Sequence, residues 1–375
     1  MNRAPQIEDL NRTETALYMA LELADKSWKL GFTEGRSNIR IRTVEARNLE
    51  AVREEIKRAQ VRFQLPAGTV VKSCYEAGRE GFWIHRWLRS IGVRNVVVDP
   101  SSMEVPRKSR RAKTDKIDVR KLGFDLVRHH RGENVWSVVR VPSEKDEDDR
   151  RFMRERERLL KEKNQHRCRI MSLLATQGIR MDVREDFPEK LEKVRLFCGS
   201  PLGAQLKREL LRQFDRLRLV QRQLKQLAVE QQEYVEEGGP KVEMIQLLES
   251  VKAIGPVTAW LLTMEFFGWR KFKNRKQVAS AAGLTGTPYN SGDGSREQGI
   301  SKAGNPRVRR LIIEIAWLWL RYQSGNRHSQ WFRERFAVGK RSRRVGIVAV
   351  ARKVLIDLWR LVELGLVDDI ELKAA

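Results

Sequence analysis

ALYMALEL at residues 16–23 is followed by SWKLGF at 27–32 and NIRIRTV at 38–44. The short polar segments ADK, at 24–26, and EGRS, at 34–37 after Thr33, separate the three runs. Each run is rich in β-branched, aromatic or aliphatic residues and is bounded by residues that favour turns. The pattern predicts three consecutive β-strands with turns at ADK and EGRS.

Helical and strand-like segments alternate after this beginning. Residues 48–60 have apolar side chains at helical spacing, 68–77 and 94–100 are strand-like, 82–90 is helical, and a last helix begins near Thr114. Three strands, helix, strand, helix, strand and helix is the element order of the ribonuclease-H-like fold. We therefore expect an α/β domain of this class over residues 14–143.

The composition changes between residues 144 and 237, where Lys, Arg, Glu, Gln and Leu dominate. Apolar side chains recur every three or four residues at Leu206, Leu210, Leu217, Val220, Leu224 and Leu227, with Gln213 in the one gap. This heptad-like seam predicts two long helices that form a coiled coil. An antiparallel hairpin within the chain and a coiled coil between chains both fit it.

A mostly helical region is expected over residues 238–375, interrupted by a glycine-rich loop at 283–305. Its first part, LLESVKAIGPVTAWLLTMEF at residues 247–266, predicts a helix, a turn at IGP and a second helix. This resembles a helix-hairpin-helix element, whose turn amides and basic neighbours bind phosphates without contacting bases. An ordinary pair of packed helices is the alternative.

The charge balance points to a polyanionic partner. The 375 residues include 74 Lys and Arg against 49 Asp and Glu, and the resulting net charge of +25 favours nucleic acid. No run of about 18 apolar residues could span a bilayer, and the first residues have no signal-peptide core. Cys74, Cys168 and Cys198 fit neither a disulfide framework nor a zinc site. We expect a cytoplasmic, nucleoid-associated protein with no membrane contact.

Four carboxylates stand where a ribonuclease-H-like fold gathers metal ligands. Glu22 interrupts the first strand, Glu76 closes the fourth, and Asp115 and Asp118 share one face of the last helix. Carboxylate oxygens are the ligands that Mg²⁺ prefers, and two ions roughly 4 Å apart can activate a nucleophile and hold a leaving oxygen. The sequence therefore predicts a site for Mg²⁺, or for Mn²⁺ in its place.

Each acid also has an ordinary explanation. Glu22 could face solvent from an edge strand, and Asp115 and Asp118 could be acids that the helix dipole favours in a first turn. The joint order of the four acids on the expected elements favours the metal site. The basic residues just before the last helix are candidate phosphate contacts, namely Arg110, Arg111 and Lys113.

Three segments resemble the RuvC-like domain of DEDD-type transposases of the insertion sequence 110/116/902 family. They are ALELADKSWKLGF, YEAGREGFWIHRWLRSIGVRNVVVDP and AKTDKIDVRKL. The resemblance implies that Glu22, Glu76, Asp115 and Asp118 are the four metal-binding acids. The family usually has Asp at the first position, where this chain has Glu22. Asp25, three residues later, is the second candidate.

The segment VASAAGLTGTPYNSGDGSREQGISKAGNPRVRRLIIEIAW resembles the C-terminal domain of the same family. The family implies a loop serine that attacks the scissile phosphate and becomes covalently linked to it, and Ser291 matches it by motif position. Ser280, Ser295 and Ser301 are the other loop serines. Ser280 fits helix packing, and Ser301 fits a helix N-cap.

Basic residues follow this loop. They are candidate phosphate contacts or, alternatively, parts of a solvated helix face: Lys302, Arg307, Arg309 and Arg310.

The resemblance implies a DNA transposase or recombinase that cuts and rejoins strands at the element ends and at the target. It further implies a structured guide RNA and assembly as a homodimer or homotetramer. A RuvC-like structure-selective endonuclease would use the same carboxylates with water as nucleophile. An inactive nucleic-acid-binding relic is the third hypothesis.

Overall fold

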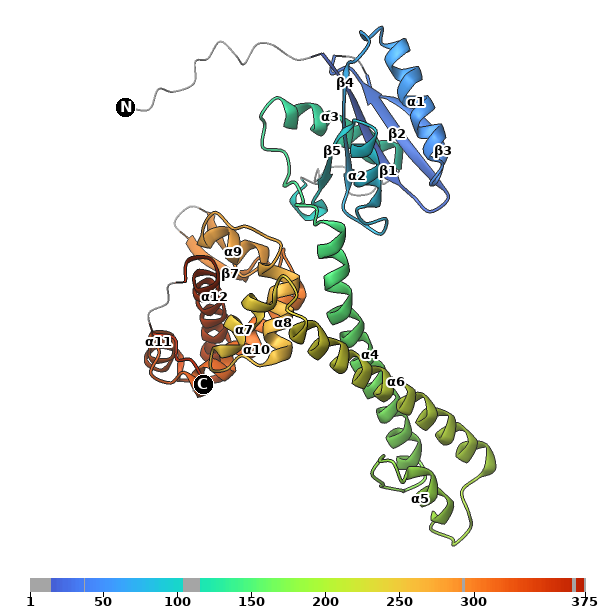
Figure 1. Ribbon diagram of the computed structural model, residues 1–375, viewed down its shortest axis with the longest axis vertical. Helices are drawn as coiled ribbons and strands as arrows, with labels where there is room; N and C mark the ends of the chain where they lie inside the picture. Colours follow the sequence, from blue (N-terminus) through green and yellow to red (C-terminus); the bar gives the residue numbers. More distant parts are fainter. Residues whose placement is uncertain (1–14, 37, 104–114, 292–293, 366–368, 374–375) are drawn as a thin grey trace. The chain divides into compact units, whose positions relative to one another are not determined.

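The computed structural model describes residues 15–36, 38–103, 115–291, 294–365 and 369–373. The chain divides into two compact units, the first ending at Val141 and the second beginning at Pro142. Each unit has its own hydrophobic cores (Figure 1).

A mixed five-stranded sheet forms the centre of the first unit. Its strands are β1 (Ala16–Leu23), β2 (Ser27–Thr33), β3 (Arg40–Glu45), β4 (Val70–Glu76) and β5 (Arg94–Val98). The strands lie in the order β3-β2-β1-β4-β5. β1 pairs antiparallel with β2, and β2 with β3, whereas β1, β4 and β5 are parallel. The three predicted strands at the beginning of the domain are thereby confirmed.

Helices cover both faces of this sheet. α1 (Leu49–Arg62) and α2 (Trp83–Ser90) pack on the face that carries Leu17, Met19 and Leu21 of β1. α3 (Asp115–His130) packs on the opposite face. β1 is buried along most of its length because both faces are covered, which explains its nearly continuous apolar sequence. The element order is consistent with the predicted ribonuclease-H-like fold. Thr114, the expected cap of α3, lies outside the described residues.

An antiparallel helical hairpin opens the second unit. Its long arms are α4 (Glu144–Ala175) and α6 (Ala204–Glu236), with the short α5 (Phe187–Lys193) packed at the far end (Figure 1). Apolar side chains of α4 meet α6 in reverse order, so that Leu159 clusters with Val220 and Ile170 with Leu210. Of the two arrangements open from the sequence, the structure has the hairpin within the chain.

The polar interruption of the apolar seam is satisfied within this hairpin. The Gln213 side-chain oxygen lies 2.8 Å from His166 Nδ1 on the opposite arm. Both side chains are half-buried, and a pair of polar groups between two helices disfavours registers in which the pair is broken. The seam therefore has one preferred alignment, while its classification as a coiled coil stays a prediction.

The rest of the second unit is mostly helical, as expected. It comprises α7 (Val242–Ser250), α8 (Pro256–Leu262), a π-helical turn (Thr263–Phe267), α9 (Arg275–Ala281), β6 (Gly286–Ser291), β7 (Gly294–Ile300), α10 (Pro306–Tyr322), α11 (Arg327–Phe336) and α12 (Lys340–Leu364). One apolar core joins the helices. No helix within the described segments is both long and apolar enough to cross a lipid bilayer.

The glycine-rich segment differs from the loop that was expected. β6 and β7 pair antiparallel from Gly286 and Ile300 up to Ser291 and Gly294. The sequence contains Thr287 and Tyr289, whose side chains favour strands, on one side of the glycine-rich turn. Glycine content obscured this pattern, because it predicts a turn but not what flanks the turn.

An ion pair between a half-exposed arginine and a buried glutamate ties the helical hairpin to the C-terminal core. The Glu265 carboxylate is fully buried in the π-helical turn and accepts two hydrogen bonds from Arg154 of α4, at 2.7 and 3.2 Å. Farther along, the Lys241 ammonium lies 2.7 Å from both Asp146 and Asp149 of α4. These contacts fix the base of α4 against the helical core.

We expect Arg154→Ala to destabilise the second unit strongly. The substitution leaves the Glu265 carboxylate buried without its guanidinium. A fully buried pair would cost roughly 3–5 kcal/mol, and because Arg154 is 41% exposed we expect about 2–3 kcal/mol. The matched control is Arg158→Ala, whose exposed pair with Glu162 at 3.2 Å contributes at most about 0.5 kcal/mol. Urea unfolding followed by tryptophan fluorescence measures both losses, and equal losses would contradict the prediction.

Candidate functional site

Glu22 and Glu76 occupy the ends of two neighbouring parallel strands. Leu21 of β1 is paired with Tyr75 of β4, so each glutamate is the next residue on its strand. Side chains alternate along a strand, and Ala20 and Cys74, two residues earlier, both pack in the core beneath α3. Both glutamates are therefore on the α3 face and half-buried. β1 lies inside the sheet, which excludes the edge-strand explanation of Glu22.

A lysine links these strand ends to the first turn of α3. Lys29 of β2 stands directly opposite Glu22 in the antiparallel pair, so the two side chains share a face. The Lys29 Nζ lies 2.5 Å from Asp115 Oδ2. Asp118, one turn farther along α3, is half-buried. The four predicted acids thus come from three elements that meet at one end of the sheet.

Two glycines let α3 lie close to the sheet. A Cβ atom on Gly123 of α3 would stand 2.6 Å from Ile39 Cδ1, and one on Gly31 of β2 would stand 2.9 Å from Ile39 Cγ2. Real Cβ atoms do not approach so closely, so Ile39 fills the space that both glycines leave. The height of α3 above the strand ends, and with it the place of Asp115 and Asp118, depends on this packing.

Two further residues of this region were not singled out in the sequence. The first is Lys29. The second is Asp125, a buried acid that lies seven residues after Asp118 and therefore on the same face of α3. Burial raises the pKa of the Cys74 thiol, and the negative charges of Asp125 and Glu76 add to the effect. The spacing of Asp118 and Asp125 was the available signal. The sequence contains no comparable signal for Lys29, because its contact with Asp115 depends on how the strands pair.

The acids share one region without forming a closed ligand cluster. Among the residues that the structure describes, no group of three or more Asp, Glu, His or Cys side chains is close enough to hold a metal ion. The donor atoms are all carboxylate oxygens, which suit Mg²⁺. The Lys29 ammonium already offsets the charge of Asp115 through Oδ2 of that carboxylate.

Asp25, the second candidate for the first acid, lies in the exposed turn after β1. Its Oδ1 is 3.0 Å from Arg79 and 3.6 Å from Arg47. Two guanidinium groups therefore compensate its charge already. Glu22, on the face that carries Glu76, has the better position.

Ser291 is the last residue of β6, and its backbone pairs with Gly294 across the end of the hairpin. Ser295 lies on β7 opposite Asn290, and Ser280 is exposed on α9. The expected capping role of Ser301 is wrong. Its backbone amide donates to the carbonyl oxygen of Thr285. The cap of α10 is instead Asn305, whose side-chain oxygen accepts hydrogen bonds from the backbone amides of Arg307 and Val308. The proline at the first helical position leaves the cap to the asparagine before it.

β6 and β7 form a hairpin that carries Ser291, here called the serine hairpin. Three of the four predicted cations that follow it have partners within the chain. Arg307 and Arg310 each donate to Glu157 of α4 at 2.7 Å. Burial alone would raise the pKa of the Glu157 carboxyl, but these two guanidinium groups outweigh it and lower that pKa below its usual range.

Arg309 donates to the carbonyl oxygens of Ala282 and Lys302, at 3.2 and 2.9 Å, and so closes the base of the serine hairpin. Lys302 is exposed and has a positive φ of 58°. Arg110, Arg111 and Lys113 lie outside the described residues. Phosphate binding by any of these side chains stays a prediction.

Comparison with known proteins identifies the family. Residues 245–335 match the description "Transposase IS116/IS110/IS902 family". The chain is 38% identical to "Putative transposase y4rJ" of Sinorhizobium fredii, over 94% of this chain and 93% of the relative. The chain belongs to the IS116/IS110/IS902 transposase family. It is also 26% identical to "Probable family 20 transposase" of Pseudomonas aeruginosa, over 89% of this chain and 96% of the relative. It is 24% identical to the transposase of insertion sequence element IS1533 of Leptospira borgpetersenii, over 66% of this chain and 70% of the relative.

The matched residues of this transposase run from α7 into α11 and contain the whole serine hairpin. A transposase is an enzyme that transfers DNA strands, and the excess of basic residues suits that substrate. The carboxylate region of the first unit lies outside the matched segment. Its interpretation depends on the geometry of β1, β4 and α3.

The packing of Ile39 between the two glycines predicts a specific energetic coupling. Gly123→Ala places a methyl group 2.6 Å from Ile39 Cδ1, and Ile39→Val removes that atom. The double variant should therefore be more stable than the sum of the single variants by about 0.5–2 kcal/mol. A double-mutant cycle in urea measures this coupling, and additive losses would mean that α3 has room to shift.

Proposed function

We propose that this transposase cuts and rejoins DNA with two groups of residues, four carboxylates on a RuvC-like, ribonuclease-H-like first domain and Ser291 of the second unit. The observation that carries the proposal is the convergence of Glu22, Glu76 and α3 at one end of a β3-β2-β1-β4-β5 sheet. The predicted division into residues 14–143, 144–237 and 238–375 assigns the metal chemistry to the first part and the serine to the third.

The carboxylates Glu22, Glu76, Asp115 and Asp118 would hold Mg²⁺ or Mn²⁺. When bound, the ion stabilises the negative charge that develops on the phosphate and on the attacking and leaving oxygens. The chain places two of these acids on rigid strand ends and two on a helix packed against the sheet. Such supports hold ligands more accurately than loops do. In the longer Glu22 side chain, the carboxylate reaches farther from the strand than an aspartate would.

Ser291 would act as the nucleophile. Its Oγ forms a bond to phosphorus while the bond to one sugar oxygen breaks, and that leaving oxygen takes up a proton. The product is a phosphoserine link that keeps the energy of the phosphodiester. Attack by a sugar hydroxyl of the second DNA end reverses the step and returns the proton to Ser291. Strand joining then needs no external energy source.

The family resemblance further leads us to propose a structured guide RNA that pairs with the element ends and the target. The net charge of +25 is large enough to suit both RNA and DNA. A homodimer or homotetramer would bring two DNA ends together. The seam between α4 and α6 is a candidate coiled coil, and the α7–α8 turn, where Ala253 has a φ of 82°, is a candidate helix-hairpin-helix.

Asp118→Asn tests the carboxylates. The variant keeps the size of the side chain but loses its charge, so metal-dependent cleavage of labelled junction DNA should fall by roughly 10³-fold, which corresponds to several kcal/mol. Binding of the same DNA without metal should persist. Asp148→Asn, at an exposed acid of α4, is the control. Undiminished cleavage by Asp118→Asn would exclude the proposed site.

Ser291→Ala tests the nucleophile. With the flanking noncoding RNA, Mg²⁺ and junction DNA, the wild-type protein should give a protein–DNA adduct on a denaturing gel, and Ser291→Ala should give none. Ser280→Ala changes an exposed serine of α9 and should leave the adduct intact. Cleavage without an adduct, unaffected by Ser291→Ala, would instead indicate hydrolysis by water.

A further inference from the structure

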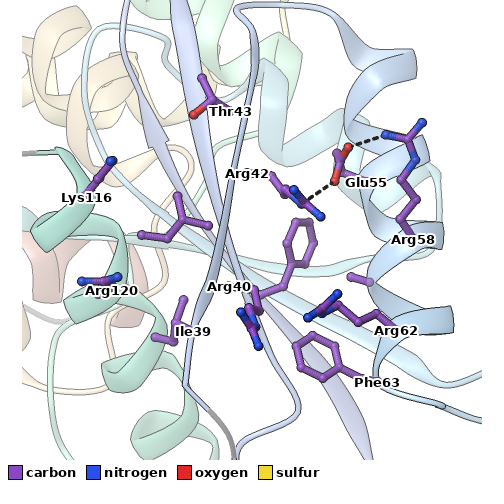
Figure 2. Close-up of a pocket in the computed structure, with 13 residues that line it drawn as sticks. Ile39, Arg40, Arg42, Thr43, Glu55, Arg58, Arg62, Phe63, Lys116 and Arg120 are labelled. Atoms are coloured by element: carbon purple, nitrogen blue, oxygen red, sulfur yellow. Dashed lines mark hydrogen bonds and ion pairs between the residues drawn. The ribbon is translucent and has the colours of Figure 1, made fainter.

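A groove of about 480 Å³ lies at the outer edge of β3 in the first unit. β3 forms its floor, α1 forms one wall, and the first two turns of α3 form the other, as Figure 2 shows. The groove is distinct from the strand ends that carry Glu22 and Glu76. It is joined to them by α3, whose first turn carries Asp115.

Basic side chains from all three elements line this groove. They are Arg40 and Arg42 of β3, Arg58 and Arg62 of α1, and Lys116 and Arg120 of α3. Among the described residues that line the groove, Glu55 is the one acid, and it contacts Arg42 at 3.5 Å and Arg58 at 2.7 Å (Figure 2). In this described lining, six cations therefore face a single carboxylate.

Four of the six cations are not neutralised. Within the described part of the chain, no ion pair joins Arg40, Arg62, Lys116 or Arg120 to a carboxylate, and all four are exposed. Like charges gathered in one groove repel each other, and a bound polyanion removes that repulsion.

Protection of a sheet edge does not account for the cluster. Basic side chains on an edge strand discourage pairing with other chains, and this explains Arg40 and Arg42. It does not explain Arg58, Arg62, Lys116 and Arg120, which lie on helices on either side of the strand. These four side chains line the same groove from the helices, where they add positive charge but cannot protect a strand edge.

We propose that this groove binds the phosphate backbone of the element's DNA and leads it to the carboxylates. Guanidinium groups match phosphate oxygens in a planar, bidentate geometry, and five of the six cations are arginines. Contacts of this kind position the backbone without selecting a sequence. The half-buried Phe63 at the α1 end offers an apolar surface to the sugars.

DNA is the occupant that the geometry favours. Lys116 and Arg120 lie on the helix that carries Asp115 and Asp118, so a strand held by the α3 wall lies beside the proposed cleavage chemistry. The strand to be cut is DNA, whereas a guide RNA has to be kept from these acids. This choice of DNA over RNA rests on the proposed function, but the binding itself does not.

The charge-reversal variant Arg62→Glu/Arg120→Glu, with one change in each wall, tests the groove. The control is Arg89→Glu/Arg140→Glu, at two exposed arginines outside the groove, which changes the net charge equally. Binding of a labelled duplex of the element end is measured by fluorescence anisotropy in EDTA over a salt series.

The groove variant should bind roughly 10-fold or more weakly, with a salt slope lower by about 2, because two phosphate contacts are lost. Equal affinities and slopes for the two variants would overturn the proposal. Weaker binding of the guide RNA with unchanged DNA binding would overturn the choice of DNA.

Cross-linking gives a second test that does not depend on charge. Thr43→Cys places a thiol on the exposed floor, and Lys57→Cys places one on the opposite side of α1. Both are made in a Cys168→Ser/Cys198→Ser background, which removes the exposed native thiols and keeps the buried Cys74. After attachment of an aryl azide and illumination, DNA should cross-link to position 43 and not to position 57. Equal or absent cross-linking at both positions would contradict the groove.

The two proposals can fail separately. The groove is measured by binding without metal, whereas the carboxylates are measured by cleavage in Asp118→Asn. An active Asp118→Asn protein with a DNA-binding groove would remove the metal site and keep the groove. If instead Asp118→Asn is inactive and Arg62→Glu/Arg120→Glu binds DNA normally, the metal site stands and the groove is excluded.

Discussion

The close packing of α3 on the sheet is the constraint on which the first unit depends. Gly31 and Gly123 leave a space that Ile39 fills, with no room for a Cβ on either glycine. One helix thereby carries Asp115 and Asp118 toward the ends of β1 and β4 and carries Lys116 and Arg120 toward the groove beside β3. The candidate cleavage site and the candidate DNA path are two sides of the same packed helix.

Electrostatic compensation explains how acids survive at a half-buried strand end. Lys29 stands opposite Glu22 and contacts Asp115, so a cation of the chain itself offsets the cluster. The Lys29 ammonium therefore offsets the carboxylate charge at this end of the sheet.

Two acids, the buried Glu265 and the half-buried Glu157, join α10 to the long helix α4 in the second unit. Glu265 contacts Arg154 of α4 and, at 3.4 Å, Asn305, the residue that caps α10 directly after the hairpin. Glu157 of α4 holds Arg307 and Arg310 of the same helix α10. The beginning of α10, which follows the hairpin in the chain, is therefore fixed against α4.

The sequence pattern alone predicted the strands of the first unit and the long helices, because the periodicity of apolar residues is a local property. It also gave the positions of four acids on these elements, namely Glu22, Glu76, Asp115 and Asp118. The family also followed from local motifs. Strand pairing and helix packing, which join residues far apart in the sequence, settled the rest. They revealed Lys29 as the partner of Asp115, turned Arg307 and Arg310 toward Glu157, and gathered the arginines of β3, α1 and α3 into one groove. No local pattern contains such contacts, since each is made only when distant segments fold together.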